Sequence, residues 1–340
     1  MAAFISGREL SRRLALEVVL PHLRTQTNKP FALALLGPGS DVLGFDDETS
    51  MDHGWGPRVQ VIGDLDELDF SGIPDEFLGL SVKMAGPWHE PLRVYRPDDF
   101  TNAILGDVAV SPSDPISFLL VTQQELRSLT QPNVWHDEIG LAARLSPFKQ
   151  FPKDIKFYLL ASLWSRIGEE EHLVGRASMR GDEVGATLIA ARVVRDFMRI
   201  CFLLEDAYAP YPKWFEHAFR QLDCGPEVLD LATRVFDAKG LDERDGALAA
   251  LSIRVCGLFA DRKLVDTQLH VHQFYGRPIS VCVADSEVVQ ALLSRITDPA
   301  LVHLAKRRPM GSIEMISDSV DVLENHSLRS GFRALFATVD

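Results

Sequence analysis

Residues 35–58 read LLGPGSDVLGFDDETSMDHGWGPR and contain the most informative pattern in the chain. The apolar run at residues 31–36 predicts a β-strand that ends in the turn Gly-Pro-Gly-Ser. Twelve residues after Ser40 comes a lone acid, Asp52, which precedes a second β-like run at residues 58–62. The pattern predicts a small mixed sheet, with Ser40 at the tip of the first strand and the acid on its neighbour.

This arrangement suits the binding of a nucleoside triphosphate. Glycine lets a backbone come close to phosphate oxygens, so Gly39 is a candidate cofactor-binding residue. The hydroxyl of Ser40 can donate to one of those oxygens, and the carboxylate of Asp52 can ligate Mg²⁺. A strand, a Gly-Ser turn and an acid on the next strand are typical of the nucleotidyltransferase fold. We therefore expect Mg²⁺ with ATP, or with another nucleoside triphosphate, at this loop.

The second acid that such a site needs is missing. Nucleotidyltransferases usually carry Asp-x-Asp at this point, whereas this chain has Asp52, His53 and Gly54. Gly54 offers no metal ligand, and His53 points away from Asp52 if the segment is extended. The acids at 46–48 are alternative ligands if their loop folds back. One carboxylate can hold one Mg²⁺, which takes further oxygens from phosphates. The sequence therefore leaves open whether the chain is an enzyme.

Composition narrows the class of protein. The 340 residues are 46% hydrophobic and 24% charged, which is ordinary for a globular chain, and their number favours two domains. A net charge of −13 argues against long nucleic acid as a partner, because that binding relies on clustered Lys and Arg. The four cysteines are scattered, which suits a reducing compartment. No apolar run has the length of a membrane span and no signal peptide is recognised, so we expect a cytoplasmic protein without membrane contact.

The pattern of the chain changes near residue 150. Strands and short helices alternate before it, which predicts an α/β domain over residues 1–148. Long helical patterns follow and predict an all-helical domain over residues 149–340, so the expected fold class is α+β. Within residues 184–204, apolar side chains recur at spacings of three and four. This spacing predicts a helix that buries Leu188, Ala191, Met198 and Cys201.

Two long stretches resemble a known family. They read GPGSDVLGFDDETSMDHGWGPRV and GDEVGATLIAARVVRDFMRICFLL, with YAPYPKWF shortly after the second. They are similar to the signature of domain of unknown function 4037, and the resemblance covers most of the chain. It implies a nucleotidyltransferase-like domain followed by an all-helical one, a layout similar to antibiotic nucleotidyltransferases of the kanamycin and streptomycin type. It implies no established reaction. Members often show Asp-His-Asp-Trp or Asp-His-His-Trp where this chain has Asp-His-Gly-Trp.

The helical region supplies further candidates. Arg192, Arg195 and Arg199 share one helix face, where they either pair with nearby acids or bind a triphosphate or an anionic substrate. Arg192 is the best single candidate because it lies deepest in the family-like motif. Lys213 follows an aromatic cluster and is interpreted either as part of a packed corner or as a phosphate contact beside a ring that stacks on a base.

The catalytic base is the least defined part. In antibiotic nucleotidyltransferases a Glu from outside the Asp-bearing strands takes the proton, and Glu170 is the candidate for that role here. The run 169–171 is otherwise a solvated helix face. Asp182 and Glu183 compete for the role, although acids at the start of a helix also complement its dipole. His270 and His272 share one face of a strand but lack further ligands at metal-site spacing.

These patterns together predict a protein that binds a Mg-nucleotide in the cleft between its domains. In an active enzyme, a nucleotidyl group passes to a hydroxyl of an unidentified small molecule or protein, with Ser40 on phosphate and Asp52 on the metal. Two alternatives stay open. One is a catalytically degenerate nucleotide-binding or regulatory protein. The other is a scaffold reassigned to a different small-metabolite reaction, with Asp52 and His53 as acid and base. The sequence does not show the oligomeric state.

Overall fold

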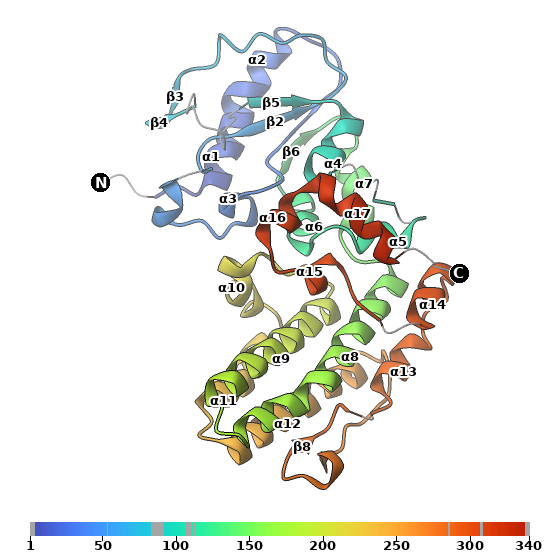
Figure 1. Cartoon of the computed structure of the whole chain (residues 1–340). Coiled ribbons are helices and arrows are strands. Elements are labelled where there is room, and N and C mark those ends of the chain that lie inside the picture. Colours follow the sequence, from blue (N-terminus) through green and yellow to red (C-terminus); the bar gives the residue numbers. More distant parts are fainter. Residues whose placement is uncertain are drawn as a thin grey trace. The chain divides into compact units, whose positions relative to one another are not determined.

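The computed structural model describes residues 4–52, 54–82, 92–106, 110–111, 113–284, 286–306 and 309–336 (Figure 1). The chain forms two compact units, residues 1–110 with 121–149, and residues 111–120 with 150–340. The first unit contains a mixed sheet with helices and the second is largely helical, so the predicted α+β class is confirmed. None of the described helices combines the length and apolar character needed to cross a membrane.

A four-stranded sheet organises the first unit. Its order is β5-β2-β1-β6, with β1 antiparallel to β2 and β6, and β2 parallel to β5. Leu33 of β1 lies opposite Val61 of β2, and all of β1 is buried. The two predicted strands are therefore confirmed as neighbours. The strands of this sheet are β1 (Ala32–Ala34), β2 (Val59–Ile62), β5 (Leu92–Tyr95) and β6 (Val134–Asp137).

The N-terminal helical segment covers the sheet. The hydroxyl of Ser6 caps it by accepting the N–H of Glu9 at 3.3 Å. Its middle turns are π-helical, and Pro21 follows them, a residue that cannot donate a backbone hydrogen bond. The segment consists of α1 (Gly7–Leu14), η1 (Ala15–Val19) and α2 (Leu20–Arg24). Its buried side chains form one core with those of the strands, comprising Leu14, Ala15, Val19, Leu23, Phe31, Leu33, Val59, Val61, Ile73 and Val82.

Short elements complete this unit. They are α3 (Ser40–Leu43), η2 (Glu48–Asp52), β3 (Glu76–Phe77), β4 (Leu80–Ser81), α4 (Pro97–Leu105), α6 (Gln123–Leu129), α7 (Leu141–Leu145) and η3 (Ser146–Phe148).

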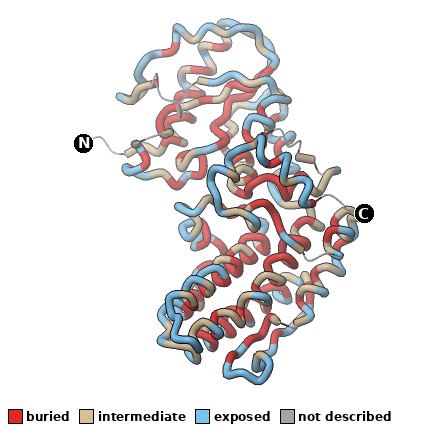
Figure 2. The backbone as a smooth tube through the Cα atoms, in the orientation of Figure 1, coloured by how far each residue is buried: buried red, intermediate tan, exposed pale blue. Residues whose placement is uncertain are grey.

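Four helices form the centre of the second unit, α8 (Lys153–Ser178), α9 (Glu183–Leu204), α11 (Gly225–Asp237) and α12 (Leu241–Asp261). Their facing sides are buried (Figure 2). The ring of Trp164 packs edge-on against Phe197, with centroids 5.5 Å apart, and lies 5.9 Å from Phe259. These aromatic contacts join three of the helices into one core.

Smaller elements surround these four helices. They are α5 (Pro115–Phe118), η4 (Pro212–Trp214), α10 (Phe215–Phe219), β7 (His272–Gln273), η5 (Phe274–Gly276), β8 (Ser280–Val281), α13 (Val288–Leu293), α14 (Pro299–Lys306), α15 (Ile313–Ile316), α16 (Val320–Glu324) and α17 (His326–Phe336). The segment 111–120 belongs to this unit, where the carbonyl of Leu119 accepts the N–H of Ile313 at 2.9 Å.

Helix α9 buries a different face from the predicted one. Leu188 is 65% exposed and Ala191 lies at the surface, although Met198 and Cys201 are buried as expected. The sequence carries two apolar stripes at spacings of three and four. The buried stripe contains two alanines, which let neighbouring helices approach closely. It consists of Ala186, Ala190, Val193, Phe197, Ile200 and Leu204.

This correction can be tested with two truncations on the same helix. Ile200→Ala should lower the free energy of unfolding by about 3 kcal/mol, because it leaves a cavity in a closed core. Leu188→Ala should change it by less than about 0.5 kcal/mol, because the side chain is already hydrated. Urea unfolding followed by helical circular dichroism measures both. Similar losses in the two variants would mean that Leu188 is also buried in solution.

Two carboxylates hold the segment 280–284 against the helices. Asp245 of α12 accepts the N–H of Ser280 at 2.8 Å. Glu171 of α8 accepts the N–H groups of Cys282 at 3.1 Å, Val283 at 2.8 Å and Ala284. Burial raises the pKa of Asp245 to about 6 and also raises the pKa of Glu171. Side chains therefore satisfy backbone donors that a further strand would otherwise pair.

The raised pKa of Asp245 predicts a pH-dependent stability. Because the folded state binds this proton more tightly than the unfolded state, the contribution is fully present below about pH 4 and is lost as pH rises through about 6. Asp245→Asn keeps an acceptor for Ser280 and removes the titration. Between pH 5 and 8 the wild type should lose on the order of 1 kcal/mol relative to this variant, after allowance for solvent screening. Parallel pH profiles of thermal unfolding would contradict the assignment.

Candidate functional site

The Gly-Pro-Gly-Ser turn follows β1 and is fixed by side-chain hydrogen bonds. The amide of Gln60 accepts the N–H of Leu36 at 2.8 Å and donates to its carbonyl at 2.6 Å. The N–H of Gly37 reaches the carbonyl of Ser128 at 3.3 Å. Gly39 has a φ of 143°, a conformation that side chains rarely adopt. Ser40 then begins the four-residue helix α3, so it lies several residues beyond the strand and not at its tip.

A buried ion pair lies directly under this turn. Nη2 of Arg58 donates to Oδ1 of Asp41 at 2.6 Å and to Oδ2 at 2.7 Å. Asp41 is fully buried, and the side chain of Arg58 is 14% exposed. Burial raises the pKa of Asp41, and the charge of Arg58 opposes that rise. Neither residue was predicted as part of the site, although Asp41 follows Ser40 directly and Arg58 immediately precedes β2.

Asp46 and Asp47, two of the three acids at 46–48, have structural roles. Oδ2 of Asp46 accepts the N–H of Gly7 at 2.7 Å and the indole N–H of Trp55 at 2.8 Å. Oδ1 of Asp47 accepts the N–H groups of Thr49 and Ser50 in the short helix η2. These bonds use one oxygen of each carboxylate and tie Asp46 and Asp47 to the protein around the loop.

The turn presents several donors without protein partners. Within the described residues, the N–H groups of Gly39 and Ser40 and the hydroxyl of Ser40 make no hydrogen bond. Nε of Arg58 is buried and also lacks a partner there. A Cβ on Gly39 would lie 2.7 Å from Nη2 of Arg58. The guanidinium and the open donors therefore share one small region of the first unit.

Asp52 does not lie on a strand, contrary to the sequence-based expectation. It ends η2, and β2 begins only at Val59. Its side chain, like the whole of His53, lies outside the described residues. Gly54 has a φ of 61°, so it is not extended either, and the prediction that His53 points away from Asp52, which assumed a strand, loses its basis. The role of Asp52 as catalytic and metal-binding residue stays a prediction.

The structure brings together two candidates of the second unit. Arg192 donates to Oε1 of Glu170, which pairs α9 with α8. Burial raises the pKa of Glu170, and the charge of Arg192 opposes the rise. Its other oxygen, Oε2, is buried and has no partner among the described residues. Glu170 and Arg192 therefore form one ion pair, and a change in the charge of either residue affects the other.

The other two arginines of the predicted face contact the segment around α15. Nη1 of Arg195 donates to Asp318 at 3.0 Å, and Nη1 of Arg199 donates to the carbonyl of Glu314 at 3.2 Å. Asp196 pairs with Arg166 of α8. All three guanidiniums of the predicted stripe therefore have protein acceptors.

The remaining candidates lie apart from that group. Lys213 is exposed in η4, with Nζ 5.0 Å from the centre of the Trp214 ring. Nδ1 of His272 lies 3.2 Å from the carbonyl of His270. Among the residues that the structure describes, no group of three His, Cys, Asp or Glu side chains is arranged to hold a metal.

Comparisons with known proteins give one family and one solved structure. Residues 118–215 match the model of a domain of unknown function, DUF4037. This range contains Glu170, Arg192 and Lys213 but not the glycine-rich turn. The crystal structure of a nucleotidyltransferase-like protein from Exiguobacterium sibiricum aligns with 80% of this chain and 97% of its own, at 10% identity and a TM-score of 0.35. Such a score describes only a loose correspondence of two backbones. No curated protein matches the sequence significantly.

The close contacts at Gly39 make its replacement costly. In Gly39→Ala, the new Cβ would lie 2.3 Å from Oδ1 of Asp41 and 2.7 Å from Nη2 of Arg58. Gly140→Ala is the matched control, because Gly140 also has a positive φ, of 70°, but has open space around it. The control should lose about 1–2 kcal/mol of unfolding free energy from backbone strain alone. Gly39→Ala should lose clearly more in the same urea titration. Equal losses would mean that the turn is not packed against the ion pair.

Proposed function

We propose that the first unit of this chain, part of which lies in the range 118–215 that matches the DUF4037 model, binds the phosphates of a Mg-nucleotide at residues 39–41. The observation that carries the proposal is the group of open donors beside Arg58. Two backbone N–H groups, the hydroxyl of Ser40 and the guanidinium lie in one region. Donors of these kinds bind phosphate oxygens, and the charge of the arginine strengthens the bonds that its own guanidinium donates.

The ion pair prepares Arg58 for this role. Because both oxygens of Asp41 accept from Nη2, the guanidinium is held in one orientation and loses little freedom when an anion arrives. The neighbouring glycine leaves the space that a side chain would fill. Asp41 itself is not a candidate metal ligand, since both of its oxygens are already occupied.

The proposed metal ligand is Asp52, and the exposed carboxylate of Glu48 is the alternative in the same loop. Asp46 and Asp47 accept hydrogen bonds from the protein, and Gly54 provides no ligand. Mg²⁺ would then take most of its oxygens from phosphates and water, with one carboxylate from the protein. Bound in this way, the metal neutralises phosphate charge.

The sequence of the loop favours nucleotide binding without turnover. Transfer requires an acceptor hydroxyl to lose its proton and attack a phosphorus while pyrophosphate leaves, a step usually assisted by a second metal ligand or base. The Asp52-His53-Gly54 sequence lacks the second acid. Glu170 remains the proposed base for an active form, with Arg192 and Lys213 as further phosphate contacts.

Calorimetric titration with ATP, with and without Mg²⁺, tests this proposal. Ser40→Ala should weaken Mg-ATP binding about tenfold, the effect of one lost hydrogen bond to a charged group. Asp52→Asn should abolish the dependence on Mg²⁺, because the metal strongly prefers anionic oxygen. Glu48→Gln removes a nearby exposed acid and should change neither quantity. Release of pyrophosphate from the same samples reports any turnover.

Each outcome has a distinct meaning. Equal ATP affinity in wild type and Ser40→Ala would remove the turn from the binding site. Loss of the Mg²⁺ effect in Glu48→Gln, but not in Asp52→Asn, would move the metal to Glu48. Pyrophosphate release by the wild type would replace the binding-only form with an active transferase.

A further inference from the structure

Arg166 of α8 and Arg195 and Arg199 of α9 form an arginine cluster, and residues 314–318, which we call the strap, contact all three. Nη1 of Arg199 and Nη1 of Arg166 each donate to a backbone carbonyl of helix α15, at 3.2 and 2.8 Å. Nη1 of Arg195 donates to Oδ1 of Asp318 at 3.0 Å. One short run of chain therefore supplies acceptors to guanidiniums from two helices.

The charges of the cluster and of the strap are complementary. On α8 and α9, the cluster and Arg192 bring four positive charges, and two acids of the same helices, Glu170 and Asp196, pair with part of them. A surplus of two positive charges remains. The strap brings two further acids, Glu314 and Asp318, whose charges act on the cluster. The strap thus neutralises the helix surface as a ligand with two negative charges would.

The strap belongs to a stretch of chain with few apolar contacts. Ile313, directly before it, is fully buried, and Arg329 beyond it is buried as well. Between them, none of the residues 314–325 is buried, and Ile316 and Val320 are 40% and 59% exposed. Segments with so little buried apolar surface open at a low cost in free energy. The strap is therefore anchored on both sides but depends largely on the arginines for its own position.

Phosphate is a stronger acceptor for these arginines than the strap. Two of the three strap acceptors are neutral carbonyls, whereas a guanidinium bond to an anionic oxygen is about twice as strong. Nε of Arg195 is buried and has no partner among the described residues, so the strap leaves one donor of the cluster unsatisfied. The planar guanidinium matches phosphate geometry, and linked phosphates offer oxygens to several arginines at once.

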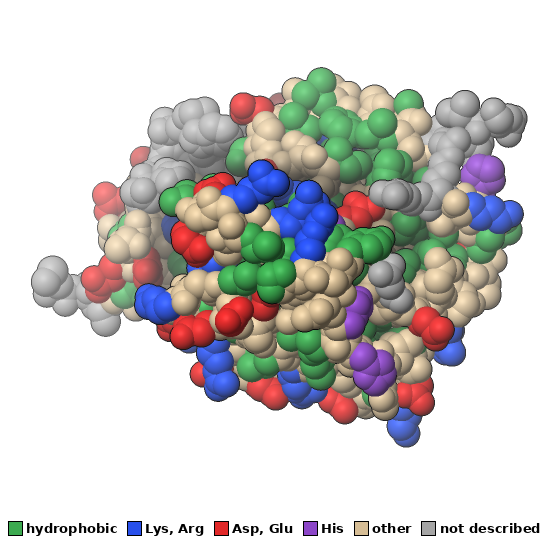
Figure 3. Space-filling model, turned by 60° about the horizontal axis from the view of Figure 1, so that its bottom comes forward, with side chains coloured by type: hydrophobic (Ala, Val, Ile, Leu, Met, Phe, Trp, Pro, Cys, Tyr) green, Lys and Arg blue, Asp and Glu red, His purple; other side chains and the backbone are tan. Residues whose placement is uncertain are grey.

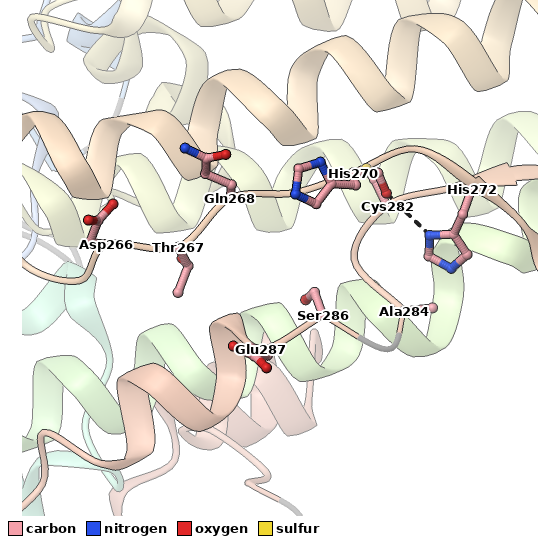
Figure 4. Close-up of a pocket in the computed structure, with 9 residues that line it drawn as sticks. All are labelled: Asp266, Thr267, Gln268, His270, His272, Cys282, Ala284, Ser286 and Glu287. Atoms are coloured by element: carbon pink, nitrogen blue, oxygen red, sulfur yellow. Dashed lines mark hydrogen bonds between the residues drawn. The ribbon is translucent and has the colours of Figure 1, made fainter.

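Other surfaces of the molecule do not offer this chemistry. The pocket of about 440 Å³ in Figure 4 has no Lys or Arg among its described lining residues, and its Asp266 and Glu287 would repel an anion. On the face shown in Figure 3, acidic and basic side chains are interspersed. The arginine cluster is therefore the stronger candidate for an anion site in the second unit.

We propose that the arginine cluster is a binding site for an oligophosphate group, and that the strap occupies this site until the anion displaces it. When the strap leaves, its two acids leave with it, and the surplus of positive charge becomes available to the ligand. Because the flanking residues stay buried, the displaced strap can return. The site lies in the second unit and does not rest on the nucleotide site proposed at residues 39–41.

Hydrogen exchange of the full chain, followed by mass spectrometry, tests the displacement. The N–H groups of Met315 and Ser317 donate to the carbonyls of Ser312 and Ile313, both at 2.9 Å. Inorganic triphosphate should break these bonds and speed exchange in peptides that cover residues 314–318 about tenfold. Sulfate at equal ionic strength should not. ATP should act as triphosphate does, because the phosphates are the recognised group.

Two substitutions should change triphosphate affinity in opposite directions in a calorimetric titration. Asp318→Asn weakens the competing strap and should tighten binding about threefold, the effect of one exposed ion pair. Arg195→Gln removes a donor of the site and should weaken binding about tenfold. Their side chains are 68% and 35% exposed, so both variants should fold. Asp321→Asn, an exposed acid of α16 with the same change of charge, is the matched control and should leave the affinity unchanged.

Several results would overturn the proposal. Slower exchange of residues 314–318, or weaker binding in Asp318→Asn, would mean that the ligand and the strap do not compete. A response to ATP but not to triphosphate would assign recognition to the nucleoside, and binding of an acidic peptide alone would favour a protein partner. Equal affinity in the wild type and Arg195→Gln would place the anion elsewhere. A loss in Ser40→Ala would then assign it to the turn of the first unit, so failure of the two sites is distinguishable.

Discussion

The buried ion pair between Asp41 and Arg58 links the glycine-rich turn to the central strands of the first unit. Asp41 lies in the short helix α3 after the turn, and Arg58 immediately precedes β2. Removing either partner would leave the other charge buried without compensation, which is far more costly than the pair itself is favourable. The path of the turn, the glycine at position 39 and the open donors around Ser40 all depend on this contact.

Hydrogen bonds on either side of the ion pair hold the turn in place and leave its donors open to a ligand. Gln60 fixes the entry to the turn through two bonds to Leu36, and Asn133 donates to the carbonyls of Leu35 and Val42. Side chains thus satisfy backbone groups both before the turn, at Leu35 and Leu36, and after it, at Val42. Between them, the donors of Gly39 and Ser40 are left open. Preorganised donors of this kind bind an anion without first having to be ordered.

Local patterns in the sequence were sufficient to predict the strands of the sheet but not the residues of the candidate site. The apolar runs around Leu33 and Val61 predict adjacent strands because each must be buried, and the structure confirms them. The prediction that helix α9 buries the face with Leu188 was wrong, because two apolar stripes share the same spacing and only packing decides which one is buried. Asp52 was predicted to lie on the second strand, but that strand begins only at Val59. The pairing of Asp41 with Arg58 spans 17 residues, and no periodicity reports such a contact.

The hydrogen bonds of Glu171 have a consequence for assembly. The strands β7 and β8 form an isolated two-stranded sheet, and such sheets present an open edge to other chains. Just after β8, however, the N–H groups of Cys282, Val283 and Ala284 all point to one carboxylate. A strand from another molecule would find no donors there. The side chain thus withholds these three N–H groups, in the segment that follows β8, from β-pairing with another chain and from the aggregation that such pairing begins.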